Sequence, residues 1–311
     1  MSVGVGLVGF GSAGRQHAAA LDGLGAAEAV AVLEQDASLD VGGLPRAASW
    51  QALLADPRVE LVALCLPPGS RAALAVQALE HGKAVLLEKP PAVSVAEIDW
   101  ITDTARRFRR PVGVMLQHRM RLPAAVLDAD WADPAVTAVL EVSRYRPPAH
   151  YRRAGWRGDA VSAFGGIAAH LGVHYLDLAC QLLGEPRAVR LAPSRQLAPG
   201  IDSRVTGHIE FQSGATLAFT VTAESAFRSE RLQMLGPDGG LCVADGMVTT
   251  QLGETGQTLP TVPTPRLRRM VYEEMAEAVT TGLPPRRCHL EGARAVTAIL
   301  ASVAQDLAVA A

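Results

Sequence analysis

The sequence predicts an α/β protein of two parts, a doubly wound parallel sheet over residues 1–118 and an α+β domain with a large, mostly antiparallel sheet over residues 119–311. Three observations support this prediction. Apolar strands alternate with helical segments in the first part, strands follow one another in the second, and a glycine-rich turn joins the first strand to the first helix. Strands that are apolar throughout and separated by helices are typical of a parallel sheet covered on both faces.

The first part contains five predicted strands and four predicted helices. Ser49 is a candidate N-cap, Ser94-x-x-Glu97 is a capping box, and Pro67-Pro68-Gly69 stops the third strand. The predicted strands are 3–8, 28–33, 61–66, 84–87 and 112–116, and the predicted helices are 12–24, 49–56, 70–81 and 94–108.

In the second part the pattern changes to successive strands joined by short turns. Ser213-Gly214 and Pro237-Asp238-Gly239-Gly240 have the composition of hairpin turns. We expect the helices on one side of the sheet, and because an open apolar face needs covering, we also expect a homodimer or homotetramer. The predicted strands are 136–144, 187–195, 203–212, 215–224, 229–235, 241–245 and 247–252, and the predicted helices are 164–183, 266–281 and 290–308.

Composition and charge limit the possible partners. The chain of 311 residues has a formal net charge of −2 and no Lys/Arg cluster interleaved with aromatic residues, so we expect no nucleic-acid partner. Its longest apolar stretches have the length of a strand or are interrupted by Gly and polar residues, so we expect no membrane span. Because the first predicted strand starts at the N-terminus, we also expect no signal peptide. Four widely spaced cysteines are expected to be buried free thiols in a reducing cytoplasm: Cys65, Cys180, Cys242 and Cys288.

The turn Gly9-x-Gly11-x-x-Gly14 has the context of a dinucleotide-binding fingerprint, because it follows a strand and opens a helix. Gly9 allows the tight turn, Gly11 has no Cβ to keep a pyrophosphate from the backbone, and Gly14 lets the helix lie close to the strand. The phosphates would bind the N–H groups at the helix N-terminus. The structural alternative is a glycine-rich turn that binds nothing.

Glu34 supplies a second part of the fingerprint, since it ends the second predicted strand, 20 residues after Gly14. A carboxylate there accepts hydrogen bonds from both ribose hydroxyls and would repel a 2′-phosphate. The sequence therefore predicts a Rossmann-type domain that binds NAD in preference to NADP. The candidate cofactor-binding residues are Gly9, Phe10, Gly11, Ser12, Ala13, Gly14, Glu34, Leu66, Pro67, Glu88 and Lys89.

Lys89 is the first candidate for reaction chemistry. It lies in Glu88-Lys89-Pro90-Pro91, directly after an apolar predicted strand. Ligands of open α/β sheets bind beyond the carboxyl ends of the strands, and a partly desolvated lysine can exchange a proton near neutral pH. The alternative is a solvated loop lysine.

A second candidate region lies in the helix predicted over 164–183. His170, His174 and Asp177 are spaced i, i+4 and i+7, which places them on one helical face, and Gly172 indicates a close approach to the backbone. Three interpretations stay open: a hydrogen-bonded network in the core, a metal site with zinc-like His-x-x-x-His spacing, or a substrate pocket with His174 as the proton-transfer group. There is no convincing motif for a third ligand, so we assign no metal.

These motifs together resemble the glucose–fructose oxidoreductase/inositol dehydrogenase/MocA family of NAD(P)-dependent dehydrogenases. The resemblance spans nearly the whole chain, and the Glu-Lys-Pro element followed by a Gly-x-His-x-x-Asp helix is jointly specific. The matching positions are the glycine-rich turn with Arg15 and His17, Leu66-Pro67-Pro68, Gly82–Pro90, Arg119, Trp156-Arg157, Gly165-Gly166, Gly172, His174, Asp177 and Leu183-Gly184.

The resemblance implies hydride transfer between NAD(H) and a CH–OH/C=O carbon of a sugar, polyol or sugar derivative, with Lys89 and His174 flanking that carbon. We expect His174 to take the hydroxyl proton and Lys89 to polarise the oxygen. Relatives usually carry Asp where this chain has His170, which we expect to titrate with Lys89 as a coupled pair. This departure leaves open a changed substrate, a changed acid–base assignment or lost activity. Arg71 also departs from the common pattern, and we assign it no chemistry.

Four residues are candidates for substrate binding: Arg119, Tyr145, Arg157 and Asp177. The alternative interpretation of Arg157, given equal weight, is a structural contact with the sheet. The run Arg144–Arg157 contains five arginines and would suit an anionic substrate only if it folds inward; otherwise it is a solvated face. Two other functions stay open, an imine (C=N) reductase with the same cofactor and a non-catalytic NAD-binding sugar sensor.

Overall fold

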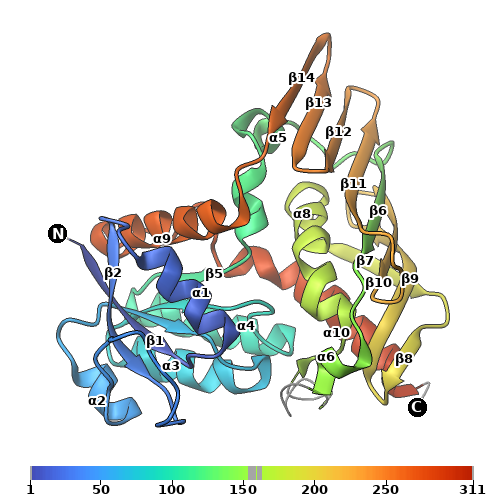
Figure 1. Cartoon of the computed structure of the whole chain (residues 1–311). Helices are drawn as coiled ribbons and strands as arrows, with labels where there is room; N and C mark the ends of the chain where they lie inside the picture. Colours follow the sequence, from blue (N-terminus) through green and yellow to red (C-terminus); the bar gives the residue numbers. More distant parts are fainter. Residues whose placement is uncertain (1, 153–158, 160–162, 310–311) are drawn as a thin grey trace. The chain divides into compact units, whose positions relative to one another are not determined.

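The computed structural model describes residues 2–152, 159 and 163–309, which form two compact units. The first unit consists of Met1–Met120 and Thr264–Ala293, and the second of Arg121–Pro263 and Arg294–Ala311. The predicted fold class is confirmed, because one unit contains a five-stranded parallel sheet and the other a nine-stranded, mostly antiparallel sheet (Figure 1).

The sheet of the first unit has the strand order β2-β1-β3-β4-β5, with all neighbours parallel. The order reverses at β1, because β2 lies on one side of it and β3 on the other. Ligands of such sheets bind at the carboxyl ends of the strands beside this reversal. The strands are β1 (Val3–Val8), β2 (Ala27–Leu33), β3 (Leu61–Leu64), β4 (Ala84–Leu87) and β5 (Val112–Val114).

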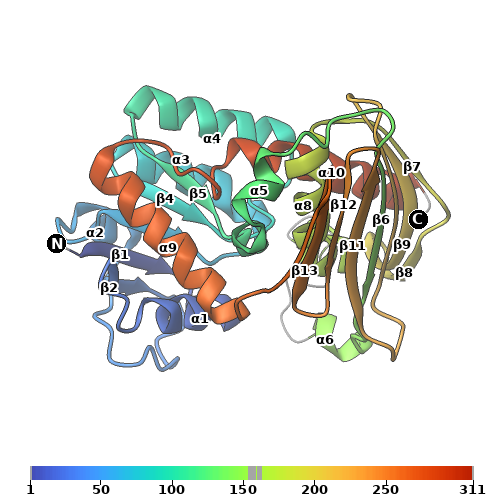
Figure 2. The same ribbon diagram turned by 90° about the horizontal axis from the view of Figure 1, so that it is seen from above.

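Helices cover both faces of this sheet (Figure 2). α1 and α9 lie side by side on one face, and α2, α3 and α4 lie on the other. The helices are α1 (Ser12–Leu21), α2 (Trp50–Ala55), α3 (Arg71–Glu80), α4 (Val95–Phe108) and α9 (Thr264–Thr281), with short 3₁₀ turns at η1 (Pro68–Ser70), η2 (Gln117–Arg121) and η5 (Glu291–Ala293).

Two predicted helix starts in the first unit are confirmed. The Ser49 hydroxyl accepts a hydrogen bond from the Ala52 N–H (3.0 Å), which satisfies one of the unpaired donors at the start of α2. At α4, Ser94 accepts from the Glu97 N–H (3.2 Å), while the Glu97 carboxylate accepts from the Val93 N–H (2.9 Å). The capping box is thus present, with its reciprocal bond one residue earlier than the usual pattern.

Helix α9 belongs to the first unit, although the chain reaches it only after the strands of the second. The domain boundary predicted at residue 118 placed this segment in the second domain. Leu267, Tyr272 and Met275 of α9 are buried in the same cluster as Val5 and Leu7 of β1. The amphipathic pattern therefore predicts the helix, but it does not identify the sheet that the helix covers.

The sheet of the second unit has the order β14-β13-β12-β11-β6-β10-β9-β7, and β8 also pairs with β9. Among the strands that the structure describes in this sheet, β6 and β10 are the one pair of parallel neighbours. The strand predicted over 187–195 is replaced by two strands, β7 and β8. β14 was not predicted, because its sequence is polar, and in the structure its residues are exposed. The strands are β6 (Thr137–Ser143), β7 (Pro186–Leu191), β8 (Arg195–Ala198), β9 (Ile201–Phe211), β10 (Thr216–Thr222), β11 (Ser229–Gly236), β12 (Gly239–Ala244), β13 (Met247–Leu252) and β14 (Thr255–Pro260).

Helices α8 (Val173–Leu183) and α10 (Arg294–Val309) cover one face of this sheet (Figure 2). A π-helical turn, Ala168–Gly172, precedes α8, and α5 (Ala124–Asp128) and α6 (Pro148–Arg152) are short. A Cβ added to Gly172 would lie 2.9 Å from Val221 Cγ2 of β10. The predicted close approach at Gly172 is therefore the packing of this helix on the sheet.

The stretch Glu291–Val309 is long and apolar enough, by composition alone, to cross a membrane (mean hydropathy 1.2). Most of it is α10, whose side chains Val296, Ile299, Leu300 and Val303 are buried. This helix contacts α8 and β7. The buried side chains of α10 thus belong to the core of the second unit.

All four cysteines are free thiols, as predicted. Cys180 and Cys288 are buried, whereas Cys65 and Cys242 are half-buried. The expectation that all four are buried therefore holds for only two of them.

Candidate active site

The glycine-rich turn has the close packing that a dinucleotide-binding turn requires. Gly9 has a φ of +84°, a conformation that favours glycine. A Cβ on Gly14 would lie only 2.2 Å from the Gly9 carbonyl oxygen, so a larger residue would push α1 away from β1. A Cβ on Gly11, in contrast, would meet no protein atom within 4 Å. No side chain of the described residues caps the start of α1, which leaves its first-turn N–H groups available to a phosphate.

Alanine at Gly14 and at Gly11 is expected to separate stability from cofactor binding. Gly14→Ala should lower the free energy of unfolding by about 1–3 kcal/mol, because the added Cβ collides with backbone. Gly11→Ala should cost less than about 1 kcal/mol and yet weaken NADH binding, because its Cβ occupies the space expected for the phosphates. Thermal denaturation and NADH fluorescence titration measure the two effects. Wild-type NADH affinity in Gly11→Ala would contradict the predicted phosphate position.

The segments that follow β1, β3 and β4 leave the sheet at the same carboxyl edge. A Cβ on Gly9 would lie 3.0 Å from Leu66 Cδ2, so the first two of these segments are in contact. The structure therefore brings the predicted cofactor residues Leu66 and Pro67 next to the glycine-rich turn. Glu88 and Lys89 continue the same edge beyond β4.

Glu34 lies against the glycine-rich turn. Its Oε2 accepts a hydrogen bond from the Phe10 N–H (2.6 Å), and its Oε1 accepts from the Asp36 N–H (3.0 Å). The half-buried carboxylate is therefore held at the end of β2, where the ribose of a dinucleotide is expected.

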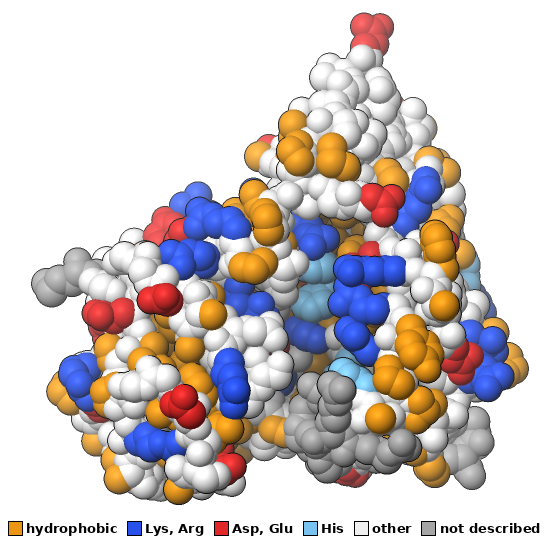
Figure 3. Space-filling view, in the orientation of Figure 1, with side chains coloured by type: hydrophobic (Ala, Val, Ile, Leu, Met, Phe, Trp, Pro, Cys, Tyr) orange, Lys and Arg blue, Asp and Glu red, His pale blue; other side chains and the backbone are white. Residues whose placement is uncertain are grey.

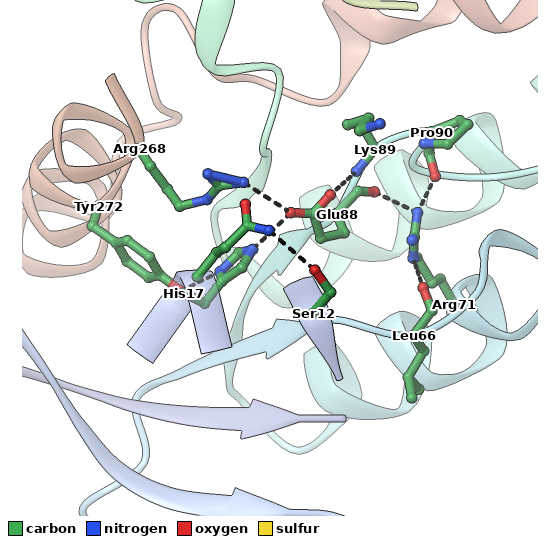
Figure 4. A network of polar contacts seen from close by, with 10 residues as sticks. Ser12, His17, Leu66, Arg71, Glu88, Lys89, Pro90, Arg268 and Tyr272 are labelled. Carbon is green, nitrogen blue, oxygen red and sulfur yellow. Dashed lines mark hydrogen bonds and ion pairs between the residues drawn. The ribbon is translucent and has the colours of Figure 1, made fainter. Parts of the chain in front are cut away.

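Glu88 is the centre of a buried polar network in the first unit (Figure 4). Its Oε1 lies 2.9 Å from His17 Nε2 and 3.8 Å from Arg268 Nη2, and its Oε2 accepts a hydrogen bond from the Lys89 backbone N–H (3.0 Å). His17 Nδ1 lies 2.6 Å from the Tyr272 hydroxyl. The network connects α1 and α9 to the end of β4 and fixes the backbone from which the Lys89 side chain extends.

Burial and charge set the protonation of this network. Burial lowers the pKa of His17, so the ring is neutral near pH 7. Burial opposes ionisation of Glu88, but the hydrogen bond from His17 and the nearby positive charges bring the pKa of Glu88 down to about 2. Since His17 Nε2 donates to this carboxylate, Nδ1 of the neutral ring accepts a hydrogen bond from Tyr272.

Arg71 joins the segments after β3 and β4, a role that was not predicted from the sequence. Its Nε donates to the Leu66 carbonyl (2.7 Å), and its Nη1 donates to the carbonyls of Glu88 (2.5 Å) and Pro90. Arg71 is buried, and burial lowers its pKa to about 10. The sequence carries no signal for this role, because it does not show whether an arginine is buried or exposed in the folded protein.

In the second unit, His174 and Asp177 are buried on α8, and His170 is half-buried in the π-helical turn before it. The Tyr151 ring lies edge-on to the His170 ring, with 6.3 Å between the ring centroids. A regular α-helix through all three positions was expected, and the π-helical turn interrupts it. Such turns occur frequently at functional sites.

Asp202 of β9 holds the start of this helical segment. Its carboxylate accepts hydrogen bonds from the N–H groups of Gly166 (2.5 Å) and Ala168 (2.8 Å). A Cβ on Gly166 would lie 2.0 Å from the Asp202 carbonyl oxygen, so only glycine allows this approach. Burial raises the pKa of Asp202, against the effect of these backbone hydrogen bonds. Asp202 was not predicted from the sequence, because it lies 36 residues along the chain from Gly166 and 34 from Ala168.

Comparison with known proteins identifies the family. Residues 3–116 match the family model described as "Oxidoreductase family, NAD-binding Rossmann fold", and residues 134–242 match the "GFO/IDH/MocA C-terminal domain". The protein belongs to the Gfo/Idh/MocA family. The resemblance predicted from sequence is confirmed, and the protein is an NAD(P)-dependent oxidoreductase of the dehydrogenase and reductase type.

Two related enzymes are named for sugars. D-xylose 1-dehydrogenase (NADP(+)) 2 of Haloferax volcanii is 29% identical over 292 residues, which cover 83% of this chain and 83% of that protein. The 1,5-anhydro-D-fructose reductase of Ensifer adhaerens is 26% identical over 217 residues, or 66% of this chain and 63% of that protein.

Solved structures share the fold at lower identity. Levoglucosan dehydrogenase in complex with NADH and levoglucosan superposes with a TM-score of 0.84 and 16% identity, over 100% of this chain and 98% of that one. The aldose-aldose oxidoreductase from Caulobacter crescentus, complexed with glycerol, gives a TM-score of 0.80 and 18% identity, over 100% and 99% of the two chains. At these identities the likeness supports the fold.

The catalytic candidates of this Gfo/Idh/MocA protein are divided between the units: Lys89 is in the first, and His170 and His174 are in the second. Their meeting at one substrate stays a prediction. Among residues 2–152, 159 and 163–309, no group of three or more His, Cys, Asp or Glu side chains is arranged to hold a metal ion. The zinc interpretation of the two histidines therefore finds no third ligand in that part of the chain.

The substrate candidates differ in their surroundings. Arg119 is buried, and its Nη1 donates to the carbonyls of Arg287 and His289 (both 2.9 Å), which favours a structural role. Tyr145 is 56% exposed, two residues beyond the end of β6. Asp177 is buried, and its Oδ1 lies 3.5 Å from Gln181 Nε2 of the same helix. Arg157 lies outside the described residues.

Proposed function

We propose that this enzyme transfers a hydride between NAD(H) and a CH–OH/C=O carbon of a sugar, polyol or sugar derivative. The observation that carries the proposal is the carboxyl edge of the first unit, where Lys89 follows β4 and the uncapped glycine-rich turn follows β1. The open space at Gly11 and the carboxylate of Glu34 fit a dinucleotide at this edge. When bound, the nicotinamide supplies or accepts the hydride.

Lys89 and His174 are assigned to the substrate oxygen. The Lys89 ammonium donates a hydrogen bond to this oxygen, and His174 takes the hydroxyl proton in oxidation and returns it in reduction. The hydrogen bond from the Lys89 N–H to Glu88 supports a fixed starting point for the lysine side chain. His170 replaces the Asp that the family resemblance implies, so the negative charge that would hold the ammonium protonated is missing at that position.

NAD is the proposed cofactor, with Glu34 as the residue that discriminates against NADP. The relative from Haloferax volcanii is named as an NADP enzyme, so this preference needs its own test. Glu34→Ala removes the charge that would repel a 2′-phosphate, and we expect the ratio of kcat/KM for NADP to that for NAD to rise about tenfold or more. Steady-state kinetics with both cofactors measure the ratio. An unchanged ratio would reject the ribose role of Glu34.

A cofactor titration followed by turnover assays tests the proposed function. NADH fluorescence first establishes binding, and oxidation or reduction is then measured over polyols, sugars and cyclic imines. Turnover of a sugar or polyol supports the proposal. Turnover of imines alone would identify an imine reductase, and tight NADH binding with no turnover would identify a sensor.

A homo-oligomer is proposed through the face of the second unit's sheet opposite to α8 and α10. Val139 of β6 and Leu235 of β11 are exposed, although each lies within a strand. Exposed apolar strand residues of this kind are common where a second copy packs. Sedimentation velocity gives the mass directly, and a monomer at micromolar concentration would reject this proposal.

A further inference from the structure

Several arginines of the second unit gather around one carboxylate on the helix-covered face of the sheet. Glu230 of β11 pairs in register with Val142 of β6, which is fully buried, so both point to that face. Arg144 lies two residues beyond Val142 and pairs with Glu230. Figure 3 shows Lys and Arg side chains beside histidines over the region of α8, β6 and β11.

The cluster carries more positive than negative charge. Glu230 accepts hydrogen bonds from Arg144 and from the Tyr175 hydroxyl (2.9 Å), and it lies 3.2 Å from Arg228 Nη2. Arg121 hydrogen-bonds Tyr175. The guanidinium groups of Arg144 and Arg228 contact the carboxylate directly, whereas Arg121 is linked to it through Tyr175. Three positive charges and one negative charge leave the cluster with a net charge of +2. The Glu230 side chain is 14% exposed and that of Arg144 29%, so solvent screens these charges only in part.

Two donors of the cluster lack an acceptor. The Nε atoms of Arg121 and Arg144 are buried, and neither has a hydrogen-bond partner in the described part of the chain. Buried N–H groups are rarely left unsatisfied, and each exception needs an explanation, of which a bound ion is one. A structural ion pair with Glu230 would need only one arginine. The excess of charge and of donors therefore calls for a further anion.

We propose that Arg121, Arg144 and Arg228 form a subsite for the anionic group of an acidic sugar, a carboxylate or a phosphate. Guanidinium groups recognise both through paired, charge-assisted hydrogen bonds. Tyr175, which contacts both Arg121 and Glu230, directly follows His174 on α8, so the same helix carries a contact of the subsite and the proposed proton-transfer group. This inference rests on the proposed function, and it narrows the substrate from sugars in general to acidic sugars.

Calorimetric titration of the NADH-saturated protein tests the subsite without turnover. The probes are D-glucuronate, D-glucose 6-phosphate and uncharged D-glucose at the same ionic strength. We expect at least one acidic sugar to bind about tenfold or more tightly than D-glucose, because an ionic hydrogen bond is lost in the neutral sugar. The two acidic probes distinguish a carboxylate subsite from a phosphate subsite. Equal affinity for all three sugars would overturn the proposal.

Single substitutions assign the effect to the cluster. Arg228→Gln and Arg144→Gln should each remove most of the preference for the acidic sugar, about a tenfold loss. Glu230→Gln should have the opposite effect and strengthen binding of the acidic sugar, because it removes the carboxylate that competes for the same donors. If the cluster had only a structural role, Glu230→Gln would not bind the acidic sugar more tightly than the wild type does. Circular dichroism shows whether each variant is folded. Because the Arg228 side chain is 67% exposed, its substitution should disturb the fold least.

Arg231→Gln is the matched control. Arg231 lies on the same strand, is exposed, and donates to Gln233, with its side chain on the opposite face of β11 from Glu230. It should keep the wild-type preference, and an equal loss in Arg231→Gln would overturn the assignment. Binding of acidic sugars that depends on Arg144 but occurs without any turnover would support the subsite and count against the proposed function, so the two failures are distinguishable.

Discussion

Lys89→Ala removes turnover and leaves NADH binding close to that of the wild type. We expect kcat to fall by on the order of 10²–10⁴-fold, the range for losing a positioned group that acts on a proton or on developing charge. The cofactor affinity is retained, because the glycine-rich turn and Glu34 are untouched. Stopped-flow or steady-state kinetics give kcat, and NADH fluorescence gives the affinity. Loss of NADH binding together with turnover would make Lys89 a cofactor contact instead.

The chain offers a sharp control, because Lys83 is its only other lysine. Lys83 precedes β4, at the opposite end of the strand from Lys89, and its Nζ donates to the carbonyls of Asp56 (3.0 Å) and Val59 (2.7 Å). Lys83→Ala should therefore lower stability while keeping the turnover of the folded enzyme. A comparable loss of kcat in Lys83→Ala would show that removal of either lysine acts through the fold.

Glu88→Ala is expected to have the largest effect on stability. The substitution leaves His17 without its acceptor, and the charge of Arg268 loses a buried counter-ion, which typically lowers the free energy of unfolding by about 3–5 kcal/mol. It also removes the acceptor of the Lys89 N–H, so kcat should fall in the protein that remains folded. Urea denaturation measures the stability. Glu291→Ala is the control, because the exposed pair of Glu291 with Arg106 should contribute less than about 1 kcal/mol.

The same network makes stability fall as the pH is lowered. The pKa of His17 is lowered from 6.5, so below pH 6.5 the unfolded chain takes up a proton that the folded protein does not bind. The pKa of Glu88 is about 2 in the folded protein against 4.5, so its contribution is complete above pH 4.5 and is lost as the pH falls towards 2. Urea midpoints between pH 3 and 8 should show both stages in the wild type. Glu88→Gln should lack the lower stage, and curves that run parallel below pH 4.5 would contradict the assignment.

Local structure in this chain could be predicted because its signals lie within a few residues. Ser49 accepts a hydrogen bond from the Ala52 N–H and Ser94 accepts one from the Glu97 N–H, so each cap lies within four consecutive residues. Gly14 packs on Gly9 five residues before it, which is why the strand, turn and helix of the fingerprint could be read as one element. The alternation of strands and helices predicted the fold class of the first unit, and the succession of strands joined by short turns predicted that of the second.

The candidate site depended on contacts between distant residues. His17 meets Tyr272 across 255 positions in the sequence, Asp202 caps a helix that precedes it by more than 30, and Arg71 binds carbonyls that follow it by 17 and 19. The sequence around each of these residues contains no motif that indicates its distant partner.

The sequence by itself determined the fold class, most of the strands and helices, and the position of the dinucleotide-binding motif. Only the tertiary structure decided that α9 joins the first unit, that Glu88 is ionised beside a neutral His17, and that Arg144 and Arg228 share one carboxylate. The physical reason is that burial and charge depend on which elements pack together, and packing brings together side chains that the sequence keeps far apart.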